Sequence, residues 1–129
     1  MMERKLYTTG AKWEDIVGYC RAVQIGNVLE ISGTTAAKDG EILFKGDAYG
    51  QAKYIIELAA KVLQDAGGSL KDVIRTRMYV TDVKDWQAVG RAHGEFFAHI
   101  KPASTMVEVS ALVDPDMLVE IEFSAILNS

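Results

Sequence analysis

Apolar residues recur along the chain with two different periods, and each period predicts a different kind of element. Short apolar or alternating runs bounded by turn residues are typical of strands, whereas apolar residues spaced three and four apart are typical of helices. The alternating runs predict strands over residues 4–8, 19–25, 28–33, 41–44, 73–80, 105–109 and 118–127. The helical spacing predicts two helices, over residues 47–66 and 82–100.

Residues that favour turns and helix ends stand between these runs. Gly26-Asn27 is a two-residue hairpin signal between two predicted strands, and Asp39-Gly40 is a second turn signal. Gly67-Gly68 suits the end of the first helix, and Asp82 suits the N-cap of the second. Pro102 is expected just past the end of that second helix. These residues therefore support the boundaries drawn from the periodicity.

Each predicted helix carries one apolar stripe, which has to be buried against another element. The stripe of the first helix consists of Ala52, Ile55, Ile56, Ala59, Leu63 and Ala66. With 129 residues and no linker or repeat, the chain has the size of a single domain spanning 1–129. The economical arrangement is an α+β fold in which two helices cover one face of one sheet.

The other face of the predicted sheet is polar. Successive side chains of a strand point to opposite faces, so parity places Ile74, Thr76, Met78 and Val80 toward the helices. Parity collects on the opposite face Glu30, Ser32, Arg75, Arg77, Tyr79, Met106, Glu108, Glu120 and Glu122. Either this face is solvated, or it packs against other subunits with its charges paired. In the second case Glu108 and Glu122 are expected to pair with Arg75 or Arg77.

Composition and charge narrow the classes of function. The formal net charge of −4 disfavours nucleic-acid binding, and the sequence contains no basic run. The single cysteine, Cys20, is expected to be a small buried hydrophobe and fits a reducing compartment. No segment has signal-peptide character or the about 20 apolar residues of a membrane span. We therefore expect a cytoplasmic protein that does not bind membranes.

The sequence lacks the common metal and nucleotide motifs. His93 and His99 are six residues apart on one predicted helix, which is not the i, i+4 spacing of two helical metal ligands. The glycines match neither the phosphate-binding loop nor the dinucleotide-binding pattern, and no G-x-S-x-G elbow occurs. We expect neither a metal nor a cofactor, and interpret His93 as a residue of the helix surface or of an interface.

Four stretches together resemble the Rid family, also called the YjgF, perchloric-acid-soluble protein or endoribonuclease L-PSP family. They read YCRAVQIGNVLEISGTT, LQDAGGSLKDVIRTRMYVTDVKDW, FF and PASTMVEVSALVDPDMLVEIEFSAI, in family order, and cover nearly the whole chain. The resemblance implies a chorismate-mutase-like α+β subunit with one mixed sheet. It also implies a homotrimer in which three sheets form a central barrel and small molecules bind at the subunit interfaces.

The best-understood members of that family hydrolyse reactive enamines and imines, such as 2-aminoacrylate, to a keto acid and ammonia, without a metal or cofactor. The resemblance implies that their water-activating glutamate corresponds to Glu120, their serine to Ser32 and their tyrosine to Tyr19. The arginine that holds the substrate carboxylate in those members is replaced here by Ser104, and the cysteine often found nearby is replaced by Met106.

The missing arginine leaves several functions open. Serine cannot supply the charge of a guanidinium group, so another cation is expected to act in its place, with Arg21 first and Arg75 or Arg77 as alternatives. The expected substrate-binding residues are Tyr19, Arg21, Ser32, Gly33, Ser104, Thr105 and Met106, with Glu120 as the catalytic residue. The leading hypothesis is an enamine or imine hydrolase whose substrate can differ from 2-aminoacrylate. The alternative is a trimer that binds a small metabolite or acts as a chaperone without turnover, and the acidic balance disfavours an endoribonuclease.

Overall fold

The computed structural model describes residues 3–128. Its helices are α1 (Lys12–Val17), α2 (Ala48–Asp65) and α3 (Trp86–Phe97), with 3-10 turns η1 (Leu70–Asp72) and η2 (Val83–Asp85). Its strands are β1 (Arg4–Tyr7), β2 (Ala22–Ile25), β3 (Val28–Thr34), β4 (Ala37–Lys38), β5 (Glu41–Ile42), β6 (Val73–Val80), β7 (Ala103–Glu108) and β8 (Val119–Ile126).

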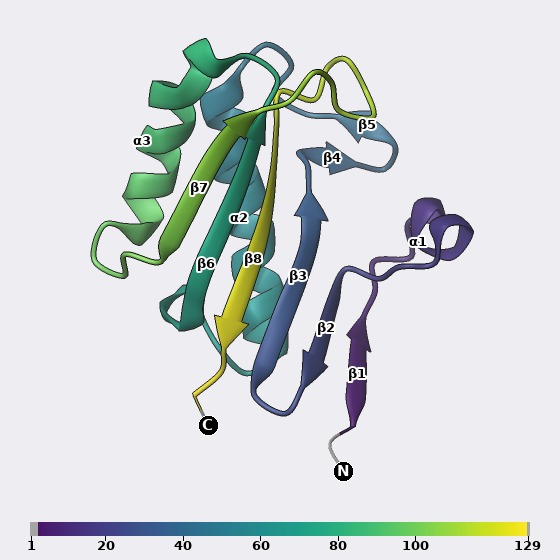
Figure 1. The fold of residues 1–129 in the computed structure, drawn as a ribbon. Helices are drawn as coiled ribbons and strands as arrows, with labels where there is room; N and C mark the ends of the chain where they lie inside the picture. Colours follow the sequence, from purple (N-terminus) through teal and green to yellow (C-terminus); the bar gives the residue numbers. More distant parts are fainter. Residues whose placement is uncertain (1–2, 129) are drawn as a thin grey trace.

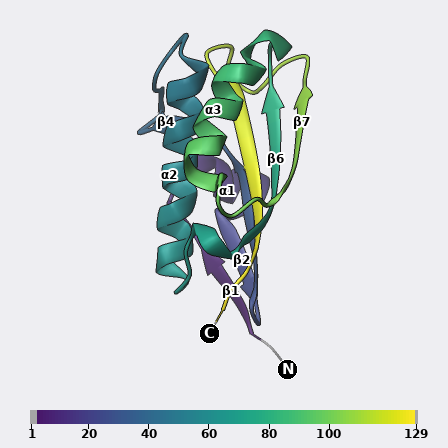
Figure 2. The same cartoon turned by 90° about the vertical axis from the view of Figure 1, so that its left-hand side faces the viewer.

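Six of these strands form one sheet in the order β1-β2-β3-β8-β6-β7. Neighbouring strands are antiparallel except β6 and β7, which run parallel. The helices α2 and α3 cover one face of the sheet, as the two views in Figures 1 and 2 show. The predicted α+β class, with two helices on one face of a mixed sheet, is confirmed. We call the face away from α2 and α3 the open face.

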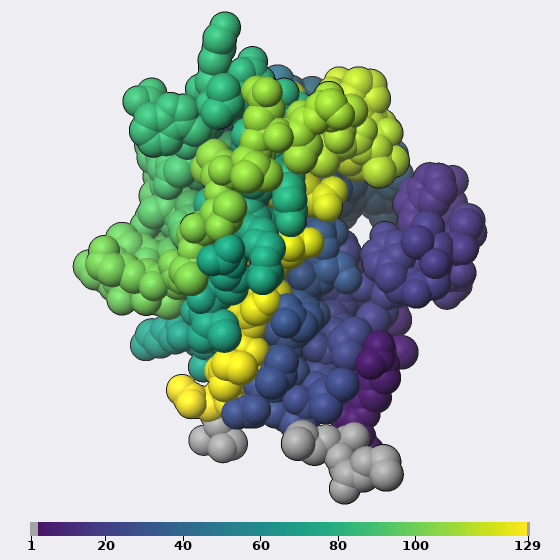
Figure 3. Space-filling view, in the orientation of Figure 1, coloured from purple at the N-terminus to yellow at the C-terminus, as the bar shows by residue number. Residues whose placement is uncertain are grey.

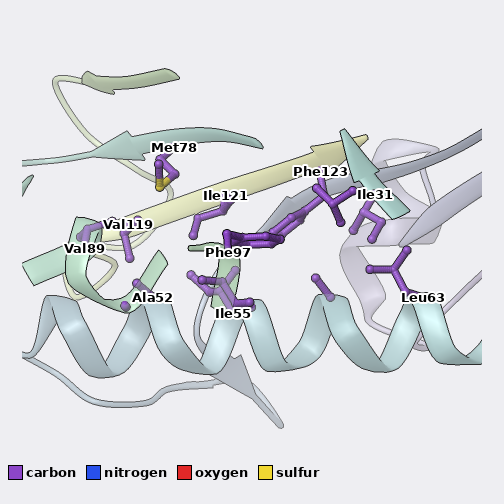
Figure 4. Packing of buried hydrophobic residues seen from close by; sticks show 14 of the residues in the cluster. Ile31, Ala52, Ile55, Leu63, Met78, Val89, Phe97, Val119, Ile121 and Phe123 are labelled. Atoms are coloured by element: carbon purple, nitrogen blue, oxygen red, sulfur yellow. The ribbon is translucent and has the colours of Figure 1, made fainter. Parts of the chain in front are cut away.

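The core lies between the two helices and the covered face of the sheet (Figure 4). The apolar stripe predicted for the first helix supplies five of its fully or nearly fully buried residues, which are Ala52, Ile55, Ile56, Ala59 and Leu63. From β8 the core takes Val119, Ile121 and Phe123, each with 0% exposure. Because side chains alternate along a strand, burying these three residues turns Glu120 and Glu122 toward the open face.

Helix α1 is a feature that the periodicity did not predict. Its apolar residues Trp13, Ile16 and Val17 are exposed, so no buried stripe marks the helix in the sequence. Its one buried residue is Glu14, which accepts hydrogen bonds from the backbone N–H of Thr9 at 3.2 Å and from the Thr9 hydroxyl at 2.7 Å. Figure 3, which looks onto the open face, shows α1 projecting sideways from the body of the molecule.

The second predicted helix is divided into η2 and α3. Asp82 caps η2, as expected, by accepting a hydrogen bond from the backbone N–H of Lys84 at 2.9 Å. α3 follows η2 without a break and begins at Trp86. The hairpin prediction at Gly26-Asn27 is confirmed, because Ile25 and Val28 are paired across that turn in β2 and β3.

A bulge overturns the predicted orientation of Ile74. The register between β6 and β8 shifts between Val73 and Arg75, so the strict alternation that parity assumes is broken at this point. Val73 and Thr76 are therefore both buried, whereas Ile74 is 51% exposed. Beyond the bulge, Thr76, Met78 and Val80 face the helices as predicted.

The predicted orientation of Met106 and Glu108 is also wrong. β7 pairs in parallel with β6, and its register aligns Met106 with buried Met78 and Glu108 with buried Val80. Met106 packs against the core, and Glu108 accepts a hydrogen bond from the backbone N–H of Val83 at 2.8 Å. Both side chains therefore lie on the helix side, and Glu108 does not pair with Arg75 or Arg77.

The loop before β8 is held by one buried side chain of α2. Gln51 has 0% exposure and donates through Nε2 to the carbonyls of Leu43, Phe44 and Asp116 at 3.2, 3.3 and 2.9 Å. Its Oε1 accepts from the backbone N–H of Leu118 at 2.9 Å. Gln51 thus fixes the point at which the chain enters β8. Across residues 3–128 there is no helix with the length and apolar character of a membrane span.

Candidate functional site

A β-bulge places the carboxylate of Glu120 over the backbone of β3. Ile31 pairs with Phe123 and Thr34 pairs with Ile121, so the two residues between them, Ser32 and Gly33, face a single residue of β8. A Cβ atom built on Gly33 would lie 2.2 Å from Oε2 of Glu120. Any side chain at position 33 would therefore displace the carboxylate of Glu120. The glycine allows this carboxylate to lie close to the backbone of β3.

Arg21 and Tyr19 lie beside this bulge. The guanidinium Nη2 of Arg21 donates a hydrogen bond to the carbonyl of Gly33 at 2.8 Å, and its Cζ is 6.0 Å from the centroid of the Tyr19 ring. The Nε atom of Arg21 is buried and has no hydrogen-bond partner within residues 3–128. The Tyr19 side chain is 42% exposed, so this group of residues reaches the surface.

Ser32 joins the bulge to the segment that carries these two residues. Its hydroxyl donates to the carbonyl of Cys20 at 2.7 Å, and its backbone N–H donates to the carbonyl of Arg21 at 3.0 Å. Cys20 is buried, as expected, and its thiol points to the carbonyl of Ala22. The structure therefore brings together five predicted site residues, which are Tyr19, Arg21, Ser32, Gly33 and Glu120.

The other carboxylates of the open face already have partners. Glu122 accepts a hydrogen bond from the Tyr79 hydroxyl at 3.0 Å and lies 3.9 Å from Nε of Arg77, which confirms its predicted pairing with one of two arginines. Glu30 accepts a hydrogen bond from the Ser124 hydroxyl. Glu120 forms neither a hydrogen bond nor an ion pair within residues 3–128. It is the candidate for an interaction with a ligand.

The surroundings of Glu120 make its carboxylate more basic than usual. Burial raises the pKa of Glu120 above 4.5, the negative charge of Glu122 raises this pKa further, and the positive charge of Arg21 partly opposes the rise. A half-buried carboxylate with a raised pKa accepts a proton more readily near neutral pH. The group of residues at the bulge therefore combines a general-base candidate with one adjacent guanidinium group.

The remaining predicted site residues lie elsewhere on the sheet. Ser104, Thr105 and Met106 belong to β7, an edge strand separated from β8 by β6. Thr105 faces the open side and accepts a hydrogen bond from Nη2 of Arg75 at 2.7 Å, whereas Ser104 and Met106 face the helix side. One chain does not bring these three residues to Glu120.

Two further residues join Ser104 in a hydrogen-bonded chain that the periodicity did not indicate. The hydroxyl of Thr76 contacts both the Ser104 hydroxyl at 2.8 Å and Nε2 of His93 at 2.9 Å. These residues are 28 and 17 positions from Thr76 in the sequence, and no spacing rule connects them. His93 is half-buried within the fold of the single chain. In the described part of the chain, His, Cys, Asp and Glu side chains form no group of three suited to a metal ion.

Comparisons with known proteins agree with the fold and with the sequence resemblance. The sequence model of the family described as "Endoribonuclease L-PSP" matches residues 6–127. A crystal structure of a member of the YjgF/YER057c/UK114 family from Mycobacterium tuberculosis superimposes with a TM-score of 0.88 at 40% identity, covering 97% of this chain and 100% of that one. A conserved Rid family protein of unknown function from Yersinia pestis gives a TM-score of 0.85 at 26% identity, covering 97% and 100%.

A curated relative connects the chain with a named activity. The 3-aminoacrylate deaminase RutC of Acinetobacter baylyi is 34% identical over 104 residues, which cover 80% of this chain and 82% of the relative. The deaminase activity is named for that relative, and the match extends over most of both chains. Together with the family match over residues 6–127, the similarity assigns this chain to the endoribonuclease L-PSP family, which includes the YjgF, Rid and RutC proteins.

Proposed function

We propose that the protein hydrolyses reactive enamine or imine intermediates to a keto compound and ammonia, with Glu120 as the group that activates water. The observation that carries this proposal is the carboxylate of Glu120, which is half-buried, has a raised pKa and has no hydrogen-bond partner within residues 3–128. The similarity to a 3-aminoacrylate deaminase supports the same class of reaction.

The proposed reaction needs one base and no external oxidant or reductant. An enamine first takes up a proton on carbon and gives up one from nitrogen, and so becomes an imine. The Glu120 carboxylate removes a proton from water while the water oxygen bonds to the carbon of the C=N group. The nitrogen accepts a proton, which gives a carbinolamine. The carbinolamine nitrogen then takes up a second proton while the hydroxyl group gives one up, the C–N bond breaks, ammonia leaves and a C=O group forms. Glu120 is well suited to remove the proton from water because its raised pKa makes it a stronger base than an ordinary carboxylate.

Arg21 and Gly33 have supporting roles in this proposal. The hydrogen bond from Arg21 to the Gly33 carbonyl holds the bulge in place under Glu120. Arg21 stays our first candidate for the cation of this site, because its guanidinium group lies beside Glu120 and partly offsets the charge of that carboxylate. Arg77 is already paired with Glu122, and Arg75 is bonded to Thr105 beside β7.

We infer that the complete site forms between subunits of a homotrimer. In one chain the group around Glu120 and the group on β7 are separate, and β7 is an edge strand with exposed residues at Ala103, Ser104 and Thr105. A neighbouring copy that presents its β7 to the Glu120 group joins the two halves. The exposed apolar residues Trp13 and Ile16 of α1 are candidates for further contacts between subunits.

The alternative is a trimer that binds a small metabolite without turnover. It is favoured by Ser104, because a hydroxyl replaces the guanidinium group that the resemblance to deaminases leads us to expect. Binding without conversion predicts that a ligand stabilises the protein and is recovered unchanged.

The deciding experiment compares the wild type with Glu120→Ala and Glu57→Ala. Glu57 lies on the exposed side of α2, away from the sheet, and serves as the matched loss of one carboxylate. Formation of keto product and ammonia is measured with 2-aminoacrylate and with several imines generated in the assay. We expect turnover to fall by about 100-fold or more in Glu120→Ala and to persist in Glu57→Ala. Equal turnover in wild type and Glu120→Ala contradicts the role of Glu120, and saturable binding without any product supports the binding alternative.

A further inference from the structure

A chain of three hydrogen-bonded side chains leads from α3 to the exposed edge of the sheet. Thr76 of β6 has 0% exposure, and its hydroxyl oxygen lies 2.9 Å from Nε2 of His93 and 2.8 Å from the hydroxyl oxygen of Ser104. Thr76 and Ser104 are direct register partners in the parallel β6–β7 pair, so both side chains lie on the helix side. Ser104 is the exposed end of the chain, and Thr76 is its buried centre.

The positions of the protons on these three side chains determine whether Ser104 donates a hydrogen bond to a ligand or accepts one from it. The hydroxyl of Thr76 has one proton. If Thr76 donates it to Ser104, His93 donates from Nε2 to Thr76, and the proton of Ser104 is left to point outward. If Thr76 donates to Nε2 instead, Ser104 donates to Thr76 and presents only lone pairs outward. The tautomer of His93 therefore sets whether Ser104 acts as an outward donor or as an outward acceptor.

His93 is suited to this role because it remains neutral. Burial lowers its pKa below 6.5, and no charged neighbour contributes to the shift. Its ring packs against Phe97 with the ring centroids 4.6 Å apart. A neutral imidazole has two tautomers, one with the proton on Nε2 and one with the proton on Nδ1. By a change of the His93 tautomer, these three side chains can therefore bind a ligand that accepts a hydrogen bond from Ser104 or one that donates a hydrogen bond to it.

We propose that Ser104, oriented by Thr76 and His93, binds an uncharged polar group of the substrate, so that the enzyme acts on neutral enamines and imines. This inference rests on the proposed function and names its substrate class. A carboxamide is the simplest such group, because it has the shape of a carboxylate, lacks the charge, and both donates and accepts hydrogen bonds.

The chemistry of the β7 edge favours this ligand over a carboxylate. Ser104 is hydrogen-bonded to the neutral side chain of Thr76, which in turn contacts neutral His93. Arg75, which is bonded to Thr105, belongs to the open face. A carboxylate held at this edge by one hydroxyl loses hydration without gaining an opposite charge, because Arg21 lies at the bulge and already offsets the charge of Glu120. A carboxamide loses less hydration and makes the same hydrogen bond. In this proposal Ser104 is a binding residue, and Thr76 and His93 are positioning residues.

The test uses pyruvate and pyruvamide, two 2-oxo compounds of nearly equal shape that differ in charge. We expect the full-length protein to bind pyruvamide about tenfold more tightly than pyruvate at neutral pH. Ser104→Ala is expected to lower the affinity for pyruvamide by about three- to tenfold and leave that for pyruvate unchanged. Ser104→Arg is expected to reverse the preference, because it supplies the charge that a carboxylate needs.

The positioning role is tested separately by the ¹⁵N chemical shifts of His93, which report the tautomer. Pyruvamide is expected to change these shifts in the wild type and in Thr76→Ser, which keeps the hydroxyl. It should leave them unchanged in Thr76→Val, which removes the hydroxyl with little change of shape. If Thr76 serves only in packing, pyruvamide will still change the His93 shifts in a folded Thr76→Val variant.

Three results overturn the inference. They are pyruvate binding as tightly as pyruvamide, no effect of Ser104→Ala on pyruvamide, and no saturable binding of either compound. These outcomes are distinct from failure of the proposed function. Turnover of 2-aminoacrylate that depends on Glu120, together with tighter binding of pyruvate, overturns the substrate class and leaves the hydrolase proposal intact. A preference for pyruvamide without any Glu120-dependent turnover overturns the hydrolase proposal alone.

Discussion

Replacing Gly33 with alanine separates the function of Glu120 from the stability of the fold. The added Cβ would lie 2.2 Å from Oε2 and 2.9 Å from Cδ of Glu120. Ordinary contact between such atoms needs about 3.5 Å, so the carboxylate has to move by about 1 Å or more. Gly33 does not have a left-handed backbone conformation, and the displaced group is the flexible end of a side chain. We therefore expect the free energy of unfolding to change by less than about 1 kcal/mol.

The same displacement is expected to be costly for catalysis. A shift of about 1 Å in a catalytic group reduces rates by about 100-fold, which corresponds to about 2.7 kcal/mol of transition-state stabilisation. The assay is kcat/KM for release of keto product from an imine, measured beside urea unfolding of the same samples. Gly94→Ala in α3 is the matched control, because its new Cβ has no atom within 4 Å.

A double variant makes the test sharper. If Gly33→Ala acts only by moving Glu120, it has little further effect in a protein that already carries Glu120→Ala. Activity of Gly33→Ala within about threefold of the wild type refutes the close approach of Glu120 to β3 as a catalytic requirement. So does an additive loss in the double variant, because it assigns Gly33 an effect of its own.

Three further predictions concern stability and protonation. Gln51→Leu removes the four hydrogen bonds of a buried side chain and is expected to lower the free energy of unfolding by about 2–4 kcal/mol and Tm by about 7–15 °C. Gln64→Leu at an exposed position of α2 is expected to change Tm little, and equal effects of the two variants contradict the anchoring role of Gln51. The pKa of Glu120 is raised above 4.5, so above that pH the folded state binds more protons than the unfolded chain, and the free energy of unfolding falls as pH rises. In urea titrations at several pH values, Glu120→Gln should lack the part of this decrease that Glu120 causes. The pKa of His93 is lowered below 6.5, so its C2 proton resonance should titrate below pH 6.5, and a midpoint at or above 6.5 contradicts the burial of the ring.

Periodicity identified the elements that are regular and missed the places where regularity breaks. The stripe from Ala52 to Leu63 was predicted because α2 keeps one helical period and buries one side throughout. The orientation of Ile74 was wrong because a bulge adds a residue to the ladder without a mark in the sequence. The orientation of Glu108 was wrong because parity alone does not say which side of a strand is covered, and the parallel pairing with β6 decides it.

The residues of the candidate site also fall into two groups, those that the sequence indicated and those that only the structure showed. Resemblance to a known family indicated Glu120, Tyr19 and Ser32, and strand parity added Arg21 beside Tyr19. The structure supplied the physical reason for their grouping, which is the bulge at Ser32 and Gly33. The hydrogen-bonded chain from Ser104 through Thr76 to His93 could not be predicted, because it joins three elements through side chains with no common period.

The position of Glu120 on β8 explains how a raised pKa can be maintained. Its neighbours Val119 and Ile121 both have 0% exposure and fix the backbone on either side of it. The strand therefore cannot shift to expose the half-buried carboxylate further, and only rotation about its own side-chain bonds remains. Holding a charged group in this way costs stability, since burial raises the pKa by destabilising the ionised form. Glu122, two residues along the same face, has partners in Tyr79 and Arg77. A carboxylate that is fixed by the core and left without such partners is what a general base requires, so the cost to folding and the proposed catalytic role have the same physical origin.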